Sequence, residues 1–270
     1  MIKNAIKPRT GKRPIGNASG ARECRTAVVT GASGMIGVAT VRRLVAAGCA
    51  VLSVDINPPP SRHANVTFLK ADVTDPAQIE VIAARAVSLF GHADALVHIA
   101  GGAGAVRAAG IETTELSTWD QVMALNVTSA FMLCRALVPA MRQARFGRVV
   151  TFSSVLAGGE KGPPTTVAAR LPYAAAKAAL LGLTAQLAKD CAADGITVNA
   201  IAPGLILGEP GTRIRDRFDA LPKADRARML AAIPAARSGT ADEVAAVVSF
   251  LLSQAAAYIN GATIPVDGAV

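Results

Sequence analysis

The sequence predicts an α/β protein with a Rossmann-type, doubly wound and mostly parallel sheet of seven strands, contained in a single domain. Two observations carry this prediction. Short apolar runs alternate along the chain with longer segments whose apolar residues recur at helical spacing, which is the pattern of a sheet covered by helices on both faces. The runs are also apolar throughout, as parallel strands buried on both faces are.

The order of the predicted elements follows from these runs and from the residues that bound them. Asp75 and Pro76 suit the N-cap and the first position of the second helix, which Gly91 ends. Thr118 and Gln121 have the spacing of a capping box at the start of the third helix. Strands are expected at residues 26–30, 50–55, 65–73, 93–102, 147–155, 196–204 and 261–268, and helices at 35–48, 75–91, 118–142, 173–195 and 240–254.

Two segments stand outside this alternation. Residues 1–24 are basic, and we expect them to be a disordered tail before the folded domain at 25–270. Residues 1–25 hold seven Lys or Arg against one Glu, so they carry +6 of the net charge of +9. Contact with nucleic acid or a membrane, or a targeting role, is the alternative interpretation of the tail. The proline-bearing region 205–238 is expected to be a flap over one end of the sheet.

The overall composition limits the class of protein. Hydrophobic residues make up 51% of the chain and charged residues 17%, which supports a substantial core. No apolar run reaches the roughly 18–20 residues of a membrane span, so we expect a soluble, cytoplasmic protein with neither a membrane nor nucleic acid as its partner. The four cysteines form no C-x-x-C pair, which indicates a reducing compartment and no metal site, with Cys24 in the tail and the other three in the core.

A glycine-rich turn, in the stretch "VVTGASGMIGVAT" at 28–40, joins the first predicted strand to the first predicted helix. Backbone N–H groups and a helix N-terminus meet at such a turn and favour the negative charge of a pyrophosphate. We expect Gly34 to allow the close approach of the phosphate, with Met35 opening the helix. By itself, the turn is weak evidence, and a tight strand–helix connection is the alternative interpretation. The predicted cofactor contacts are Gly31, Ser33, Gly34, Met35, Ile36 and Gly37.

An acidic residue in the expected place favours a dinucleotide site. Asp55 ends the second predicted strand, 24 residues after Gly31, where a carboxylate can bond the ribose of adenosine. A carboxylate there favours the 2′-hydroxyl of NAD and repels the 2′-phosphate of NADP. The nearby cations are Arg42, Arg43 and Arg62, which we interpret as solvated residues. The predicted cofactor is therefore NAD in preference to NADP.

Tyr173 and Lys177 stand four residues apart, so a helix places both side chains on one face. A tyrosine with its usual pKa near 10 is a poor base at neutral pH, but a nearby ammonium lowers that pKa. Such a pair can pass a proton to or from a carbinol oxygen. On its own, Y-x-x-x-K is a common accident on a helix.

Together with further motifs, these residues resemble the short-chain dehydrogenase/reductase family, and the resemblance covers essentially all of residues 25–270. Eight matching segments in the family's order are specific as a set, although each is weak alone. The matching segments are "TGASGMIG" at 30–37, Asp72 in "ADV", "HIAGG" at 98–102, Asn126 in "MALNV", Ser154 in "FSSV", "YAAAK" at 173–177, "NAIAPG" at 199–204 and "VDG" at 266–268.

The resemblance implies a role for each matching position. Tyr173 is implied to be the general acid/base, and Lys177 to bond the nicotinamide ribose and lower the pKa of Tyr173. Ser154, ahead of its neighbour Ser153, is implied to orient the substrate oxygen. Asn126 is implied to hold a water that connects Lys177 to solvent. The other implied cofactor contacts are Asp72 at the adenine, Val73, Ala100, Gly101, and Pro203 with Gly204 under the nicotinamide.

The sequence departs from the family pattern in four places. The glycine spacing is that of the extended branch, whereas the rest resembles the common short branch. The usual N-A-G appears as Ile-Ala-Gly at 99–101, after His98, which we interpret as a packed strand histidine. Ser154 and Tyr173 are 19 residues apart, where the family commonly has about 13, which predicts a longer loop beside the pocket. The threonine that often follows Pro-Gly is missing, and Thr212 comes late for its role.

We therefore predict an NAD(P)-dependent short-chain alcohol dehydrogenase or carbonyl reductase that transfers a hydride between the nicotinamide and a secondary alcohol or ketone. The seven basic residues of the flap leave an acidic substrate or carrier as an alternative to a solvated flap. There are two alternative functions. The protein is an isomerase or lyase of the same family, or it is a catalytically idle dinucleotide-binding regulator. An apolar substrate body is predicted from Leu205, Ile206, Leu207, Leu221 and Met229.

The predicted helices at 118–142 and 173–193 are apolar on more than one face. One face must cover the sheet, so the other is available to a second copy of the chain. The resemblance implies a homodimer or homotetramer formed through these helices.

Overall fold

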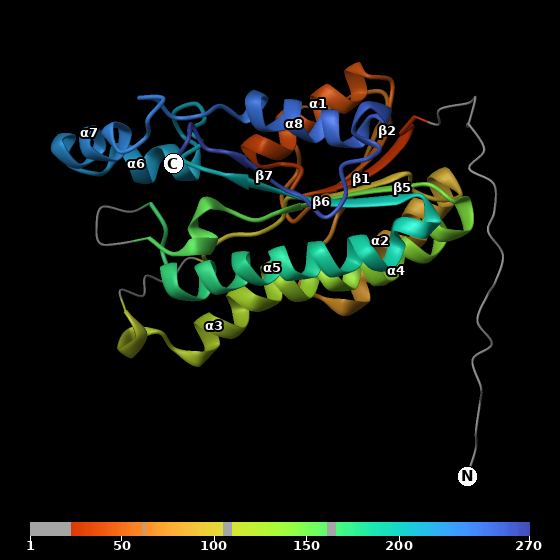
Figure 1. Cartoon of the computed structure of the whole chain (residues 1–270), viewed down its shortest axis with the longest axis horizontal. Helices are drawn as coiled ribbons and strands as arrows, with labels where there is room; N and C mark the ends of the chain where they lie inside the picture. The colour runs from red at the N-terminus through yellow and green to blue at the C-terminus, as the bar shows by residue number, and fades with distance from the viewer. Residues whose placement is uncertain (1–22, 62, 105–109, 161–165) are drawn as a thin grey trace, which may run out of the picture.

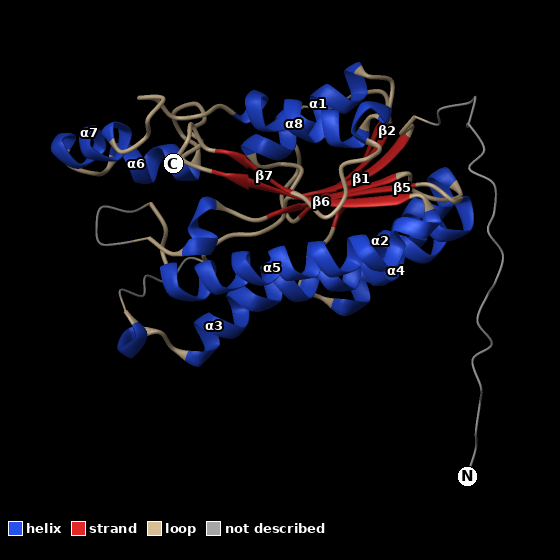
Figure 2. Ribbon diagram, in the orientation of Figure 1, coloured by secondary structure: helices blue, strands red, loops and turns tan. Residues whose placement is uncertain are grey.

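The computed structural model describes residues 23–61, 63–104, 110–160 and 166–270. Seven parallel strands form one sheet in the order β3-β2-β1-β4-β5-β6-β7, shown in Figures 1 and 2. The strand order changes direction between β1 and β4, and open α/β sheets bind ligands outside the carboxyl ends of the strands at this point. The predicted fold class is confirmed, and the sheet is wholly parallel.

The strands keep their predicted order; β1 and β2 end where predicted, whereas the other five are shorter at the carboxyl end than predicted. The chain leaves the sheet early because polar side chains form local turns there. After β3, for example, the Asp72 carboxylate accepts hydrogen bonds from the amide and the hydroxyl of Thr74, at 2.8 and 2.7 Å. The strands are β1 Thr26–Thr30, β2 Ala50–Asp55, β3 Val66–Lys70, β4 Ala95–His98, β5 Gly147–Phe152, β6 Ile196–Pro203 and β7 Thr263–Val266.

Helices cover both faces of the sheet. Figure 1 shows α1 and α8 together on one face, and α2, α4 and α5 on the other. Successive side chains of β1 point to opposite faces, so that Val28 joins the apolar cluster under α2 and α4, and Val29 joins the cluster under α1 and α8. The helices are α1 Met35–Ala46, α2 Pro76–Phe90, α3 Leu116–Met123, α4 Ser129–Ala144, α5 Arg170–Cys191, α6 Arg213–Asp219, α7 Lys223–Ala231 and α8 Ala241–Leu252.

The predicted helix at 118–142 is interrupted. α3 begins at Leu116 after Glu115, which makes no side-chain cap, and Thr118 is buried within the helix. The capping box predicted from Thr118 and Gln121 is therefore wrong. Between α3 and α4 the backbone widens into a π-helical turn, Ala124–Thr128. Single π turns inside helices are frequent at functional sites.

The continuous helical segment Leu116–Ala144 is 29 residues long and, by length and composition alone, apolar enough to cross a membrane. The expectation that no segment has this property is wrong. Of its most apolar window, 44% is buried inside the molecule. Leu133, Leu137 and Met141 of α4 belong to the apolar cluster on the sheet, which is the behaviour of a core helix.

The other helix boundaries explain where the reactive residues lie. The Asp75 side chain accepts a hydrogen bond from the Ala77 amide, and Gly91 ends α2 with φ 71°, so both predicted caps are confirmed. α5 begins at Arg170, three residues before the predicted start, and this places Tyr173 in its first turn. The flap at 205–238 contains α6 and α7, which lie beyond the carboxyl ends of the strands (Figure 1).

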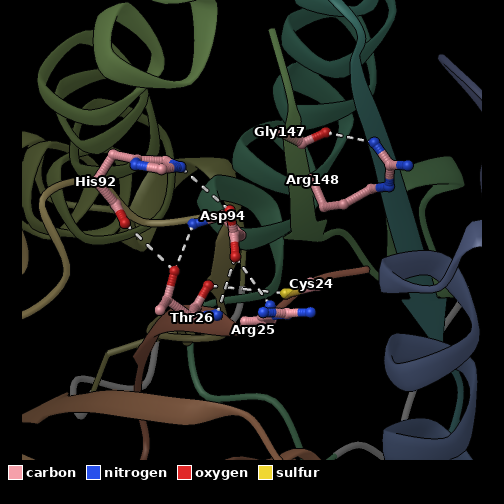
Figure 3. Close-up of polar contacts among 7 residues, drawn as sticks. All are labelled: Cys24, Arg25, Thr26, His92, Asp94, Gly147 and Arg148. Carbon is pink, nitrogen blue, oxygen red and sulfur yellow. Dashed lines mark hydrogen bonds and ion pairs between the residues drawn. The ribbon is translucent and has the colours of Figure 1, made fainter. Parts of the chain in front are cut away.

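The amino ends of the strands hold a polar cluster, drawn in Figure 3. The buried carboxylate of Asp94 accepts hydrogen bonds from the amides of Arg25 and Thr26, at 2.9 and 3.2 Å, and lies 3.3 Å from Nε2 of His92. Cys24, which we placed in the tail, instead packs against the apolar cluster under α1 and α8. Residues 1–22 of the predicted tail lie outside the described residues.

Candidate active site

A cavity of about 260 Å³ opens at the carboxyl edge of the sheet. The turns after β4, β5 and β6 form its floor, and α5 and the flap form its sides. Its lining includes Ile36, Gly101, Ser154, Tyr173, Lys177, Pro203 and Gly204 of the predicted site, together with Gly102, Ala103, Phe152, Ser153, Val155, Leu156, Glu160, Thr166, Val167, Leu205, Ile206, Arg213, Ile214, Arg217 and Met229.

The glycine turn between β1 and α1 uses its three glycines differently. Gly31 has φ +65°, and a Cβ there would lie 2.6 Å from the amide nitrogen of Ala100. A Cβ on Gly37 would lie 2.1 Å from the carbonyl oxygen of Gly31. Both glycines are thus required by packing. A Cβ on Gly34 would have only the Gly31 oxygen near it, at 3.5 Å, so Gly34 faces open space as predicted for the position that a phosphate approaches.

The N-terminus of α1 suits an anion. Gly34 is its N-cap and supplies no side-chain cap, and its first turn, which begins at Met35, contains no acidic residue. The first amides of a helix have no partner within the helix and carry its positive dipole end. These amides can therefore bind a pyrophosphate without displacing a capping side chain.

Asp55 is held at the end of β2 by the glycine turn itself. One of its oxygens accepts a hydrogen bond from the amide of Ser33 at 3.0 Å, and the other accepts from the amide of Asn57 at 2.9 Å. The carboxylate is thereby fixed next to the predicted pyrophosphate position. Asp72 and Val73 lie on the neighbouring turn after β3, and the Val73 side chain is buried in the core. Neither Asp55 nor Asp72 borders the cavity.

Tyr173 and Ser154 meet in the cavity. The Ser154 hydroxyl hydrogen-bonds to that of Tyr173, and it also accepts from the Leu156 amide at 3.2 Å. Burial raises the pKa of Tyr173, while the Ser154 hydrogen bond and the charge of Arg213 lower it. Ser153 points elsewhere, because its hydroxyl donates to the carbonyl of Lys177 at 2.8 Å. Of the two serines, it is therefore the Ser154 hydroxyl that lies with Tyr173, and Ser154 is the one that the sequence placed first for orienting the substrate oxygen.

Lys177 is buried behind the tyrosine. Its ammonium donates to the Phe152 carbonyl at 2.6 Å and lies 5.4 Å from the centre of the Tyr173 ring. Burial lowers the pKa of Lys177 to about 7. The cation that lowers the pKa of Tyr173 here is Arg213, whereas the sequence assigned that effect to Lys177.

Asn126 lies in the π-helical turn and reaches across to the turn after β4. Its amide donates to the carbonyls of Gly102 and Val122, both at 2.8 Å, and its oxygen accepts from the Gly102 amide at 3.1 Å. A Cβ on Gly101 would lie 2.7 Å from the Asn126 oxygen and 3.1 Å from Nζ of Lys177. Glycine at 101 therefore lets Asn126 and Lys177 approach the same backbone segment. The water relay remains a prediction.

His98 ties three elements together beneath this turn. Its Nδ1 is 2.8 Å from the Thr30 hydroxyl at the end of β1, and its Nε2 is 3.0 Å from the Ser129 hydroxyl at the start of α4. The Thr30 hydroxyl in turn accepts from the Ala100 amide at 3.4 Å. Burial, with a smaller effect from the Lys177 charge, lowers the pKa of His98 to about 3. His98 is therefore a neutral, packed strand histidine, as interpreted from the sequence.

The turn after β6 is closely packed. The Gly204 amide donates to the Val266 carbonyl at 3.0 Å, and a Cβ on Gly204 would lie 2.9 Å from Cα of Asp267. Thr212, farther along, donates its hydroxyl to the Glu209 carbonyl at 2.8 Å. A Cβ on Gly208 would lie 2.9 Å from both the Thr212 hydroxyl and the sulfur of Met35, so the flap lies against the glycine turn.

Sequence reasoning missed three contributors to this site. It placed no π turn at Asn126, and it treated the flap cations as one solvated group although Arg213 and Arg217 line the cavity. It predicted a longer loop before Tyr173 without naming Thr166, whose carbonyl accepts from Arg217 at 3.3 Å. The helical spacing of Arg213 and Arg217, four residues apart, was the available signal.

The residues present fit a nicotinamide dinucleotide. The uncapped α1 N-terminus, the open space at Gly34 and the fixed Asp55 carboxylate lie in sequence along one edge and lead to the cavity at Tyr173. Among the described residues, no group of three His, Cys, Asp or Glu could hold a metal ion.

Comparison with known proteins agrees with this geometry. The profile of the family described as enoyl-(acyl carrier protein) reductase matches residues 31–270. The chain is 38% identical over 252 residues to the 3-oxoacyl-[acyl-carrier-protein] reductase FabG of Salmonella typhimurium, covering 91% of this chain and 97% of the relative. It is 36% identical to the 2-(R)-hydroxypropyl-CoM dehydrogenase of Xanthobacter autotrophicus, covering 91% and 98%. Its fold matches the crystal structure of levodione reductase with a TM-score of 0.80 and 30% identity, covering 90% and 96%.

Proposed function

The chain belongs to the short-chain dehydrogenase/reductase family of NAD(P)-dependent oxidoreductases, and we propose that it interconverts a secondary alcohol and a ketone with Tyr173 as the general acid/base. The observation that carries this proposal is the hydroxyl pair of Tyr173 and Ser154 inside the cavity at the carboxyl edge of the sheet.

The bound nicotinamide supplies or accepts the hydride. In the oxidation direction, Ser154 donates a hydrogen bond to the substrate oxygen, and Tyr173 takes the hydroxyl proton from it. In the reduction direction, Tyr173 returns that proton to the carbonyl oxygen. Because both hydroxyls come from rigid elements, the start of α5 and the end of β5, much of the rate enhancement is expected from positioning.

Lys177 and Asn126 prepare this step. With a pKa lowered to about 7, Lys177 can exchange a proton near neutral pH, and its ammonium can donate to the ribose hydroxyls of the coenzyme. Asn126 holds the turn after β4 in place and is the residue we propose to hold the relay water between Lys177 and solvent.

We propose NAD as the preferred coenzyme. Asp55 supports this, because its fixed carboxylate favours a 2′-hydroxyl over a 2′-phosphate. Arg42, one of the nearby cations, is paired with Asp242 and is not aimed at that position. Arg62 lies outside the described residues. A titration of the protein with NADH and NADPH tests this, and tighter binding of NADPH would contradict it.

An apolar substrate body is supported by part of the predicted wall. Leu205, Ile206 and Met229 line the cavity, joined by Val155 and Leu156 from the loop after β5. Leu207 and Leu221, which the sequence also suggested, do not line it.

The test is the absorbance at 340 nm during incubation with NAD or NADH and a panel of secondary alcohols and ketones. We expect coenzyme-coupled turnover of at least one alcohol/ketone pair. Binding of NAD without turnover of any alcohol or ketone would contradict the proposal, and would favour an isomerase or lyase, or a catalytically idle dinucleotide-binding regulator.

We also propose that two or four copies of the chain associate through α4 and α5, in the cytoplasm. Phe131 on α4 is 51% exposed, and Leu171 at the start of α5 is 39% exposed, so apolar surface remains accessible on both helices. Light scattering coupled to size exclusion tests the assembly, and a monomeric mass would contradict it.

A further inference from the structure

We propose that Arg213 binds an anionic group of the substrate, so that the preferred substrates are hydroxy acids or oxo acids with the carboxylate at some distance from the reacting carbon. This inference rests on the proposed oxidoreductase function and specifies its substrate class.

The position of Arg213 is the first argument. It is the first residue of α6 in the flap and lines the same cavity as Tyr173 and Ser154. A Cβ on Gly102 would lie 3.4 Å from one guanidinium nitrogen of Arg213, so the guanidinium lies above the turn after β4. Its charge also lowers the pKa of Tyr173. A substrate whose oxygen lies at Tyr173 can therefore extend toward Arg213 within one cavity.

The partners of the other flap arginines are the second argument. Arg215 is paired with Asp219 at 2.6 Å, and Arg217 donates to the Thr166 carbonyl at 3.3 Å. The remaining three pair with acids of the flap or of α8: Arg226 with Asp219, Arg228 with Asp225, and Arg237 with Glu243. Within the described parts of the chain, Arg213 alone among the flap arginines has neither a hydrogen-bond nor an ion-pair partner.

The charge of the cavity is the third argument. Glu160 is the one acidic residue among its described lining, and it lies 3.7 Å from the guanidinium of Arg170. Against it stand Arg213, Arg217 and the buried Lys177. A concave surface lined by one sign of charge concentrates ligands of the opposite sign. The planar guanidinium also matches a carboxylate through two parallel hydrogen bonds.

The experiment uses pairs of ketones that differ in one charge. Levulinate, 5-oxohexanoate and 6-oxoheptanoate are compared with their methyl esters as substrates of the NADH-dependent reduction. For the chain length that fits, we expect wild-type kcat/KM for the acid to exceed that for the ester by about 10- to 100-fold, the range of a hydrogen bond to a charged group. In Arg213→Gln this preference should disappear, because acid turnover falls far more than ester turnover.

Arg215→Gln is the matched control. It removes the same charge from the same helix, but Arg215 is paired with Asp219 and does not line the cavity. We expect it to keep the preference for the acid. Equal wild-type kcat/KM for acids and esters would overturn the inference, as would an equal loss of both in Arg213→Gln, or weakened NADH binding in that variant.

A binding measurement separates this inference from the proposed function. Calorimetric titration of the NAD-bound protein with hexanoate and with methyl hexanoate reports on Arg213 without turnover. If no ketone is reduced but hexanoate binds more tightly than the ester and loses this advantage in Arg213→Gln, the proposed reaction fails and the anion site stands. If ketones are reduced but hexanoate binds no better than the ester, the anion site fails and the reaction stands.

Discussion

At the amino ends of the strands, the buried Asp94 carboxylate is bonded to the amides of Arg25 and Thr26 and to the His92 ring, all within the protein (Figure 3). At the carboxyl ends, Tyr173 is half-buried beside a cavity, and Ser154 is the one hydrogen-bond partner of its hydroxyl among the described residues. Both ends therefore hold polar groups that are at least partly removed from water. They differ in whether the protein alone satisfies those groups.

The difference shows how one sheet separates stability from chemistry. Buried polar groups that are fully bonded hold the backbone in one arrangement, and removing a partner leaves the others without hydrogen bonds. Groups with unused hydrogen-bonding capacity beside a cavity can instead bond a substrate. Substitutions at the amino end should therefore change stability without activity, and those at the carboxyl end should do the reverse.

The largest effect is expected at Tyr173. Tyr173→Phe removes the hydroxyl that transfers the proton, and it should lower kcat by about 10²- to 10⁴-fold, the usual contribution of a positioned acid/base. Because the ring remains, the melting temperature and the dissociation constant of NADH should be unchanged. Steady-state kinetics at 340 nm, with fluorescence titration of NADH, measure both. Substantial residual activity would contradict the mechanism.

Substitution of Asp94 should have the opposite effect, lowering stability rather than activity. Asp94→Ala removes the acceptor of two backbone amides at the start of β1; because Arg25 is exposed and Thr26 half-buried, each loss should cost about 0.5–1.5 kcal/mol, the net value of an ordinary hydrogen bond. We expect the free energy of unfolding in urea to fall by about 1–3 kcal/mol, with kcat/KM unchanged at a temperature where the variant is folded. Asp94→Asn, which retains one acceptor oxygen, should lose less. A loss of catalysis in folded Asp94→Ala would show that the two ends are coupled.

Much of this division could be predicted from the sequence. Asp55, Tyr173 and Lys177 could be assigned because their chemistry requires fixed spacings along single elements. The cluster at Asp94 could not, because its partners come from segments 68 and 69 residues away and a lone aspartate before a strand has no distinctive pattern. The strand ends were overpredicted because the apolar run continues into residues such as Ala71 and Val73, which are buried outside the sheet.

Arg213 is another feature that could not be identified from the sequence. Seven basic residues in the flap look alike in the sequence, and only their partners in space distinguish Arg213 from Arg215. The π turn at Asn126 is similar, because the helical pattern continues through it and nothing in "MALNV" signals an extra residue in the turn. Both features depend on tertiary contacts rather than on local propensity.

His98 shares a feature with each end of the sheet. Both of its ring nitrogens are hydrogen-bonded within the protein, as at the amino end, but it lies next to the candidate active site. Its pKa of about 3 in the folded protein is below the ordinary value of 6.5, so between these values the unfolded chain binds a proton that the folded chain does not. Stability is therefore lost as the pH falls below 6.5, by about 1.4 kcal/mol per pH unit. Between pH 6.5 and 5, urea unfolding should show a loss of about 2 kcal/mol from this residue. In His98→Gln, that part of the pH dependence should be absent, and an unchanged slope would contradict the assignment.

The smallest effect concerns the balance of charges on Tyr173. Its pKa is raised by burial and lowered by Ser154 and Arg213, so the rate of alcohol oxidation should rise with pH as the phenolate forms. Arg213→Gln removes a cation that favours the phenolate and should move this profile to higher pH. Because Arg213 is exposed and solvent screens its charge, the shift should be small. A neutral alcohol is the substrate for this measurement, so that loss of anion binding does not enter. Arg215→Gln should leave the profile in place, and a shift toward lower pH in Arg213→Gln would show that Arg213 does not act on the tyrosine as its position implies.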